Sequence, residues 1–237
     1  MPLSCPDLRE QVWRANQGLV RAGLVTLSFG NASGVDRNAG VLVIKPSGVP
    51  YDELLPEHLV VVSLEDGRVV EGDLRPSSDT PTHLVLYQHY PDIGGVVHTH
   101  STAATAWAQA GRAIPALGTT HADHFHGAVP VTRLMEEREV AGEYERETGV
   151  VIIETLDRLG LSAVEMPAAL VASHGPFTWG HDALDATANA TALEAVANMA
   201  RQTIALNPNA EKICSYLAER HYQRKHGPGA YYGQKNR

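Results

Sequence analysis

A pair of histidines separated by one residue, His98-Thr99-His100, follows the apolar run Gly95-Val96-Val97. Successive side chains of a strand point to opposite faces, so His98 and His100 are expected to point the same way, two strand rises of ~3.3 Å apart. Two imidazoles at that spacing can bind one metal ion through bonds of about 2.1 Å. Twelve histidines in 237 residues yield roughly 0.6 such pairs by chance, and His124-Phe125-His126 is a second one, so the pattern alone is weak.

The surroundings of the first pair strengthen the interpretation. A buried strand is a costly place for two polar rings unless something satisfies them. His174 follows the apolar run Ala169-Leu170-Val171-Ala172 and precedes Gly175-Pro176, and Asp79 precedes a helix start, so these two are candidate third and fourth ligands. Taken singly, His174 is more typical of a hydrogen-bonded structural histidine than of a ligand, and Asp79 is more typical of a capping or loop carboxylate. Together with Zn²⁺, the four would carry one net positive charge, which can polarise a carbonyl and stabilise an enolate, and Mn²⁺ or Co²⁺ fits the same ligands.

Two short segments have the composition of anion-binding loops. Pro46-Ser47-Gly48 and Ser77-Ser78 combine hydroxyls with free backbone N–H groups, and glycine allows close approach. Gly30-Asn31 could add donors, and Lys45 a positive charge. The alternative is plain turn chemistry. Neither G-x-G-x-x-G nor G-x-x-x-x-G-K occurs, which argues against a nucleotide-binding crevice.

Hydrophobic periodicity predicts the elements that position these groups. Helices are expected over residues 7–23, from Thr80 as N-cap and Pro81 to about 90, from about 182, and over 211–225. Strands are expected at 41–44, 59–63, 68–70, 95–100, 129–132, 150–153 and 169–172, with a hairpin turn at 65–67 and a loop at 30–34. Groups of strands with helices between them predict a single α/β domain, residues 1–237, with a mixed sheet.

Composition excludes several classes of protein. Hydrophobic residues make up 43% of the chain and charged residues 19%, as in ordinary globular proteins. Nineteen Lys and Arg against 27 Asp and Glu leave a net charge of −8, so nucleic acid is not an expected partner. No apolar run approaches ~18 residues, so no membrane span is expected. Residues 1–10 lack the pattern of a signal peptide, and Cys5 and Cys214 form no C-x-x-C, so we expect a cytoplasmic protein.

Four motifs resemble the zinc-dependent class II aldolase/epimerase family, and the similarity extends from Asn16 to Gln234. The motifs are Lys45-Pro46-Ser47-Gly48, Pro76-Ser77-Ser78-Asp79-Thr80-Pro81-Thr82-His83, His98-Thr99-His100-Ser101 and Ser173-His174-Gly175-Pro176-Phe177. The resemblance implies a three-layer α/β/α domain around a mixed, largely antiparallel sheet. It also implies a homotetramer with fourfold symmetry, whose active sites lie between neighbouring subunits.

The resemblance also implies residue roles. Zinc would be bound by Asp79, His98, His100 and His174. The substrate phosphate would be held by Gly30, Asn31, Ser47, Gly48, Ser77 and Ser78, with Lys45 nearby. Asp123 matches a catalytic acid/base, Tyr232 its partner from the adjacent subunit, and His221 a position that lines the substrate pocket.

Asp79, where the family's fuculose-phosphate aldolases carry Glu, and the pair Asp123 and Tyr232 indicate the epimerase branch of the family. Its members interconvert L-ribulose 5-phosphate and D-xylulose 5-phosphate by cleaving C3–C4, rotating the aldehyde and re-adding it. An aldolase of the fuculose-phosphate type is the nearest alternative. The pathway, L-arabinose or L-ascorbate breakdown, stays open. His124 and His126 stand where relatives usually have Tyr, and they either retune Asp123 or are surface residues.

Three further interpretations compete. One is a metal-dependent decarboxylase or dehydratase of the same fold. Another is a non-catalytic member like the head domain of adducin, against which four convergent ligands argue. The last is a metal-buffering protein, which His121, His124 and His126 would support.

Overall fold

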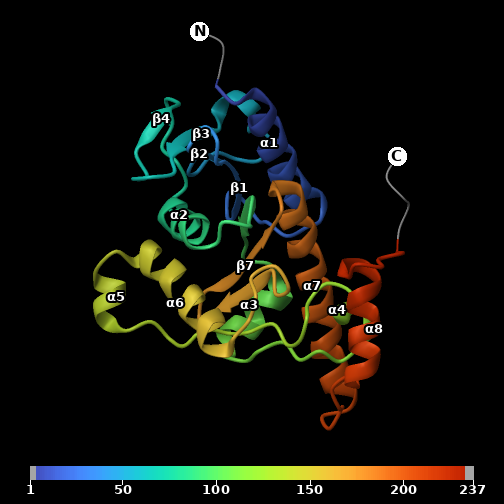
Figure 1. Ribbon diagram of the computed structural model, residues 1–237. Coiled ribbons are helices and arrows are strands. Elements are labelled where there is room, and N and C mark those ends of the chain that lie inside the picture. The colour runs from blue at the N-terminus through green and yellow to red at the C-terminus, as the bar shows by residue number, and fades with distance from the viewer. Residues whose placement is uncertain (1–3, 233–237) are drawn as a thin grey trace.

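The computed structural model describes residues 4–232, which build one seven-stranded sheet in the order β4-β3-β2-β1-β5-β7-β6 (Figure 1). Its strands are β1 (Asn31–Asp36), β2 (Val41–Ile44), β3 (Val60–Ser63), β4 (Val69–Glu71), β5 (Gly95–His98), β6 (Ala168–Val171) and β7 (Gly175–Gly180). All pairings between these strands are antiparallel. The parallel component within residues 4–232 is an isolated bridge between Val131 and Leu170.

Helices surround the sheet and account for most of the remaining chain. They are α1 (Pro6–Arg21), the short 3₁₀ turn η1 (Pro56–His58), α2 (Thr80–His89), α3 (Thr102–Gln109), α4 (Thr119–Ala122), α5 (Glu137–Ala141), α6 (Tyr144–Leu159), α7 (Ala183–Leu206) and α8 (Ser215–His226).

Alternation along the strands creates two hydrophobic cores and hence three layers. In β2, Val41 and Val43 pack with residues of α1 and α7, whereas Leu42 and Ile44 pack with residues of α2 and α6. All four are buried, because a central strand with helices on both faces has no solvent side. The predicted α/β/α architecture with a largely antiparallel sheet is confirmed.

The predicted loop at residues 30–34 is wrong: these residues begin β1, which lies between β2 and β5. Small residues that are typical of turns occur in this strand because helix α1 packs close to it. A Cβ on Gly34 would lie 2.8 Å from a Leu8 methyl and 3.0 Å from a Val12 methyl of α1. Tertiary packing therefore overrides the local turn preference.

Two predicted strands are also wrong. Residues 150–153 lie inside α6, whose β-branched side chains cover the sheet as the buried stripe of an amphipathic helix. Residues 129–132 form only isolated bridges, between Val129 and Ile114 and between Val131 and Leu170. The other predicted strands and the hairpin turn at 65–67 are present, with ends shifted by a residue or two at most places.

Smaller corrections concern the ends of elements near the histidines. Strand β5 ends at His98, so His100 lies just beyond it and the two rings do not share a strand face as predicted. Asp79, not Thr80, is the N-cap residue of α2. The chain turns at Ser173 (φ 61°) and His174, so Gly175-Pro176 begins β7 and is not the turn. Helix α8 begins at Ser215, four residues later than expected.

Helix α3, which follows His100 directly, is capped by a distant carboxylate. Its N-cap residue Ser101 makes no side-chain capping bond. Instead, Glu194 of α7 accepts the Ala103 and Ala104 amides at 2.7 and 2.9 Å. Carboxylates are favourable at a helix N-terminus because they satisfy free amides and the helix dipole.

We therefore expect Glu194→Ala to lower the free energy of unfolding by about 1–2 kcal/mol, measured by urea titration. Glu211→Ala, at an exposed position, is the control and should change it by less than about 0.5 kcal/mol. Equal effects of the two substitutions would show that the cap contributes nothing.

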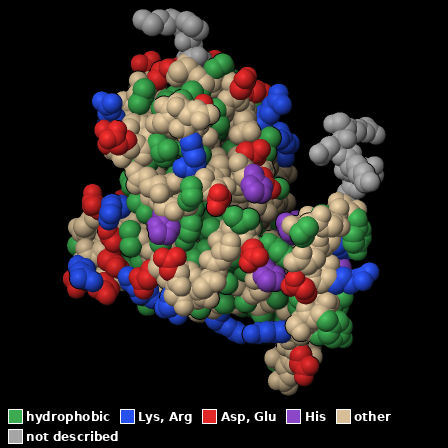
Figure 2. Space-filling model, viewed as in Figure 1, with side chains coloured by type: hydrophobic (Ala, Val, Ile, Leu, Met, Phe, Trp, Pro, Cys, Tyr) green, Lys and Arg blue, Asp and Glu red, His purple; other side chains and the backbone are tan. Residues whose placement is uncertain are grey.

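None of the helices described between residues 4 and 232 is long and apolar enough to cross a membrane. On the face shown in Figure 2, Lys and Arg side chains are interspersed with Asp and Glu.

Candidate active site

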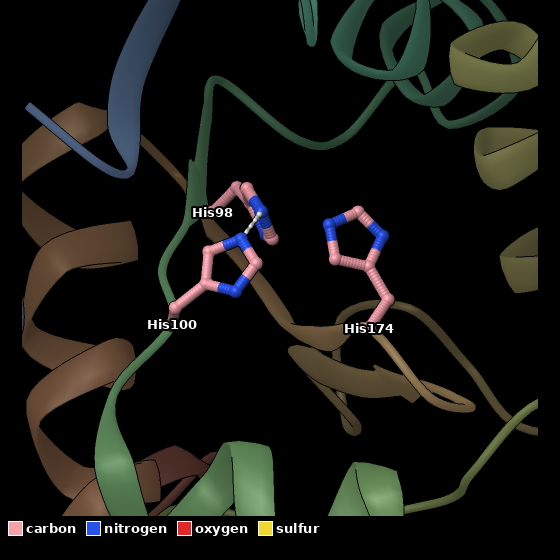
Figure 3. Close-up of side chains that lie close together, drawn as sticks. All are labelled: His98, His100 and His174. Atoms are coloured by element: carbon pink, nitrogen blue, oxygen red, sulfur yellow. Dashed lines mark hydrogen bonds between the residues drawn. The ribbon is translucent and has the colours of Figure 1, made fainter.

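Three histidines from two separate segments converge beside the sheet (Figure 3). His98 ends β5, His100 follows it, and His174 lies on the turn between β6 and β7. Each offers a ring nitrogen within 4.8 Å of the other two. This group of His98, His100 and His174 is able to bind a metal ion, and the predicted convergence is confirmed.

Hydrogen bonding prepares His98 to act as a ligand. Its Nδ1 lies 3.0 Å from the carbonyl oxygen of Pro176, which can only accept, so Nδ1 carries the proton and Nε2 a free lone pair. The Nε2 atoms of His98 and His100 are 3.1 Å apart. Two nitrogens bonded tetrahedrally to one ion at about 2.05 Å are about 3.4 Å apart. The donors therefore fit a divalent metal ion in number and type, and the His98–His100 spacing is close to that expected.

The electrostatic environment keeps the rings of His98 and His174 neutral, as metal ligands must be. Burial lowers the pKa of His98 to about 3. Burial and the neighbouring His100 lower the pKa of His174. The Phe177 ring stacks on His98 at a centroid distance of 4.2 Å and holds it in place.

Asp79 lies in the same cavity as the three histidines but outside their tight group. Its Oδ2 accepts a hydrogen bond of 2.6 Å from the Asn31 amide. Burial alone would raise the pKa of Asp79, but the imidazoles of His98 and His83 and the Asn31 bond outweigh burial and lower it. Asp79 is thus an ionised carboxylate beside the metal-binding histidines, and its role as fourth ligand stays a prediction.

A cavity of about 390 Å³ joins the histidines to the predicted phosphate-binding segments. It is lined by all of the predicted metal and phosphate residues: Gly30, Asn31, Lys45, Ser47, Gly48, Ser77, Ser78, Asp79, His98, His100 and His174. Pairing of adjacent strands explains part of this, because Asn31 at the start of β1 lies opposite His98 at the end of β5. Gly30 is required there: its φ is +81°, and a Cβ would lie 2.8 Å from the His98 carbonyl oxygen.

The two serine loops are tied to each other. The Ser47 amide donates to Arg75 O at 2.9 Å and the Ser77 amide donates to Lys45 O at 3.0 Å. These two amides are therefore not free for a ligand, contrary to the expectation for these loops. Ser47 and Ser78 are exposed and Gly48 has a φ of +70°, so hydroxyls and the open Gly48 corner face the cavity.

Lys45 supplies the cavity with a buried amine. Its Nζ donates to Val49 O at 2.8 Å and lies 4.7 Å from the centre of the Tyr51 ring. Burial lowers the pKa of Lys45 to about 8. These neighbours orient the ammonium without neutralising it, so the charge is available to an anion.

Sequence reasoning missed several further lining residues, among them Tyr144 and Glu145 at the start of α6. The Tyr144 hydroxyl lies 3.2 Å from Nδ1 of His174, which leaves Nε2 of that ring for a ligand. No motif marks either residue, because only the packing of α6 on the sheet brings them to the cavity.

The structure does not bring Asp123, His221 and Tyr232 to this cavity. They lie around α8, across α7 from the α2–α6 side of the molecule (Figure 1). Asp123 accepts bonds from His221 Nδ1 at 3.1 Å and from Arg224 Nε and Nη2 at 2.9 and 2.6 Å. The Tyr232 ring lies under the Arg224 guanidinium at 4.7 Å and is 58% exposed. We call Asp123, His221, Arg224 and Tyr232 the α8 cluster.

Within the α8 cluster, the negative charge of Asp123 is balanced by hydrogen-bond donors around it. Burial would raise the pKa of Asp123, but hydrogen bonds from Arg224 and His221 lower it. His124 Nε2 lies 3.3 Å from Lys225 Nζ, and burial lowers the pKa of His124 to about 4. His126 is exposed and pairs with Glu219 at 3.0 Å, as a surface residue would.

The fold and the histidine group define the class of protein. Residues 10–201 match the family model described as Class II Aldolase and Adducin N-terminal domain. The chain belongs to this family.

Curated relatives within it are similar over almost the whole chain. L-ribulose-5-phosphate 4-epimerase UlaF of Salmonella paratyphi A is 58% identical over 228 residues, 96% of this chain and 99% of that protein. The protein of the same name from Salmonella typhi matches equally well.

Solved structures share the fold. An L-fuculose 1-phosphate aldolase superposes with a TM-score of 0.77 at 24% identity, covering 94% of this chain and 97% of that one. YgbL of Klebsiella pneumoniae, titled a putative aldolase/epimerase/decarboxylase, does so with a TM-score of 0.69 at 25% identity, covering 92% and 99%.

Proposed function

We propose that this chain is an L-ribulose-5-phosphate 4-epimerase that interconverts L-ribulose 5-phosphate and D-xylulose 5-phosphate. The observation that carries the proposal is one cavity that joins three metal-binding imidazoles to two serine loops and a lysine. A ketose phosphate has the two matching parts, oxygens for a metal ion and a phosphate for the loops. The 58% identity to proteins of that name supports the same substrate.

The chemistry of the substrate selects the mechanism. The C4 hydroxyl is β to the C2 carbonyl, so the C4–H is not acidic and direct deprotonation cannot invert this centre. Cleavage of C3–C4 can: a base takes the C4 hydroxyl proton, C4 becomes an aldehyde, and the bond's electron pair passes into a C2–C3 enediolate. The aldehyde rotates, C3 attacks its other face, and the C4 oxygen regains a proton.

This chain supplies binding and proton transfer for those steps. Ser47, Ser78 and Lys45 hold the phosphate, so that the aldehyde fragment rotates without leaving. Inversion needs proton transfer on both faces of the aldehyde, which suits two groups, Asp123 and Tyr232. A zinc ion held by His98, His100 and His174, with Asp79, would supply positive charge to the ketose oxygens as negative charge develops there.

The separation of the α8 cluster from the cavity supports a composite site. One chain keeps Asp123 and Tyr232 away from its own histidines, while the proposed chemistry needs both sets at one substrate. We infer that the α8 cluster of one subunit completes the cavity of its neighbour in a cyclic homotetramer, since a head-to-tail interface repeated around an axis closes a ring.

The test is to incubate the zinc-loaded protein with L-ribulose 5-phosphate and follow the sugar by NMR. An equilibrium mixture with D-xylulose 5-phosphate and no free aldehyde is expected. Accumulation of glycolaldehyde phosphate would show that the protein acts as an aldolase and not as an epimerase. An unchanged spectrum with zinc bound would refute the substrate and retain the metal site.

The ionisation of Lys45 predicts how substrate binding depends on pH. Its pKa is about 8 in the free protein, so it is charged below that pH and neutral above it. The phosphate is a dianion above its pKa of about 6. KM for the sugar phosphate is therefore expected to be flat between the phosphate pKa of about 6 and the Lys45 pKa of about 8, and to rise by roughly tenfold per pH unit well above pH 8. Lys45→Arg, which stays charged, should remove the rise, and a flat wild-type KM at high pH would contradict the phosphate role.

We expect the enzyme to act in the cytoplasm. Cys5 and Cys214 are both free thiols, which suits a reducing compartment.

A further inference from the structure

A buried chain of polar groups lies behind the cavity, formed by Ser33 of β1 with His83 and Tyr87 of α2. The Ser33 hydroxyl lies 2.7 Å from His83 Nδ1 and 2.8 Å from the Tyr87 hydroxyl. All three side chains are fully buried. The other ring nitrogen of His83, Nε2, is buried without a hydrogen-bond partner. An unpartnered polar atom in a packed interior is costly, so it calls for a function.

Hydrogen counting assigns the protons of this chain. If Tyr87 donates to Ser33 and Ser33 donates to His83 Nδ1, both hydroxyl protons are used. In the reverse order, His83 Nδ1 donates to Ser33 and Ser33 donates to Tyr87. The Tyr87 proton then has no acceptor within the chain of polar groups. The first order is favoured because an unmade buried bond costs about 1–3 kcal/mol. His83 Nδ1 is then an acceptor, and Nε2 carries the proton as an unused N–H donor.

The carboxylate nearest to His83 along the chain is that of Asp79. His83 lies four residues after Asp79, and its amide donates to the Asp79 carbonyl at 3.1 Å in the first turn of α2. Helical side chains lean toward the N-terminus and meet their i−4 neighbours, so the His83 ring leans over Asp79.

In this structure His83 Nε2 makes no hydrogen bond to Asp79. We propose that His83 is a positioning residue whose Nε2–H donates to Asp79 when this carboxylate turns toward a metal held by His98, His100 and His174. Asn31 already binds Asp79 Oδ2 from β1. A donor on α2 would hold the carboxylate from its second side and so fix its direction. Tyr87 and Ser33 act one step further back, by setting the tautomer of His83. This inference rests on the metal site of the proposed function.

Two substitutions by amide side chains distinguish the roles of the two ring nitrogens of His83. Asn places its amide where Nδ1 lies, so His83→Asn keeps a partner for Ser33 and loses the donor at Nε2. Gln reaches the place of Nε2, so His83→Gln keeps that donor. Zinc affinity of the full-length protein is measured by competition with a chromophoric chelator.

We expect His83→Asn to weaken zinc binding by about 10–100-fold, as loss of a hydrogen-bond partner of a ligand does, and His83→Gln to restore it to within about threefold. Equal affinities of wild type and His83→Asn, or equal losses in both variants, would overturn the proposal. If the wild type itself binds no zinc tightly, the metal site of the proposed function fails first and the positioning role with it.

A second pair of variants covers the case in which His83 variants fail to fold. Tyr87→Phe removes the donor that sets the tautomer, so Ser33 can accept from Nδ1 and leave Nε2 unprotonated. Zinc affinity is then expected to fall by about tenfold. Tyr90→Phe is the matched control. The Tyr90 hydroxyl likewise lies in the interior, but unlike that of Tyr87 it has no hydrogen-bond partner. A Tyr87→Phe protein with the affinity of Tyr90→Phe would refute the relay.

Discussion

Replacing His98 or His174 by Gln is expected to remove the bound zinc and to lower kcat by about 10³-fold or more. A metal ion at a developing enediolate contributes several kcal/mol, and about 1.4 kcal/mol corresponds to tenfold in rate. The loss should be largest for His98, whose Nδ1 bond to Pro176 and stacking on Phe177 orient its Nε2. Metal content by elemental analysis and kcat by coupled assay of D-xylulose 5-phosphate measure the two effects.

His89→Gln is the control for these ligand substitutions. His89 is an exposed histidine at the end of α2 and does not line the cavity. Its variant should keep full zinc content and full activity. A His98→Gln protein that retains both stoichiometric zinc and wild-type kcat would eliminate the three-histidine group as the catalytic metal site.

The second large effect is expected when two inactive variants are mixed. Asp123→Asn and Tyr232→Phe should each lose about 10²–10⁴-fold in activity while keeping zinc, as loss of an acid or base does. His98→Gln lacks the metal but keeps the α8 cluster. If sites form between subunits, random co-assembly of His98→Gln with Asp123→Asn leaves roughly one site in four with both halves intact. Activity should therefore return to about a quarter of wild type.

Mixing variants of the same half provides the control. His98→Gln with His174→Gln has no intact metal half, and Asp123→Asn with Tyr232→Phe has no intact α8 cluster, so neither mixture should recover. A mixture of His98→Gln with Asp123→Asn that co-assembles and stays inactive would mean that each chain builds its site alone.

The metal centre was predictable because its residues sit at the ends of strongly apolar strands. The runs before His98 and His174 form the buried strands β5 and β6, of which β5 lies inside the sheet and β6 at its edge. Pro76-Ser77-Ser78-Asp79 likewise precedes a helix whose start is marked by Thr80 and Pro81. Local signals and tertiary environment agree at these places, so the three histidines converge as predicted, and their binding of a metal stays a prediction.

Prediction failed where packing opposes local preference. Residues 31–34 have turn chemistry but form part of β1, and Gly34 is small because a Cβ there would meet Leu8 and Val12 of α1. Residues 150–153 are β-branched but belong to α6, because a 16-residue amphipathic helix buries them against the sheet. That residues 1–237 form a single domain stays a prediction, and one cooperative unfolding transition would support it.

The amino-acid sequence by itself determined the α/β class and the ligand types, because hydrophobic periodicity and the chemistry of His, Asp, Ser and Lys are local properties. Only the tertiary structure decided which groups meet. It placed Tyr144 against His174, closed the Ser33–His83–Tyr87 chain across β1 and α2, and kept Asp123 and Tyr232 with α8. These contacts join residues that are 30 to more than 100 positions apart in the sequence. They depend on how whole helices pack on the sheet. No local pattern encodes that packing.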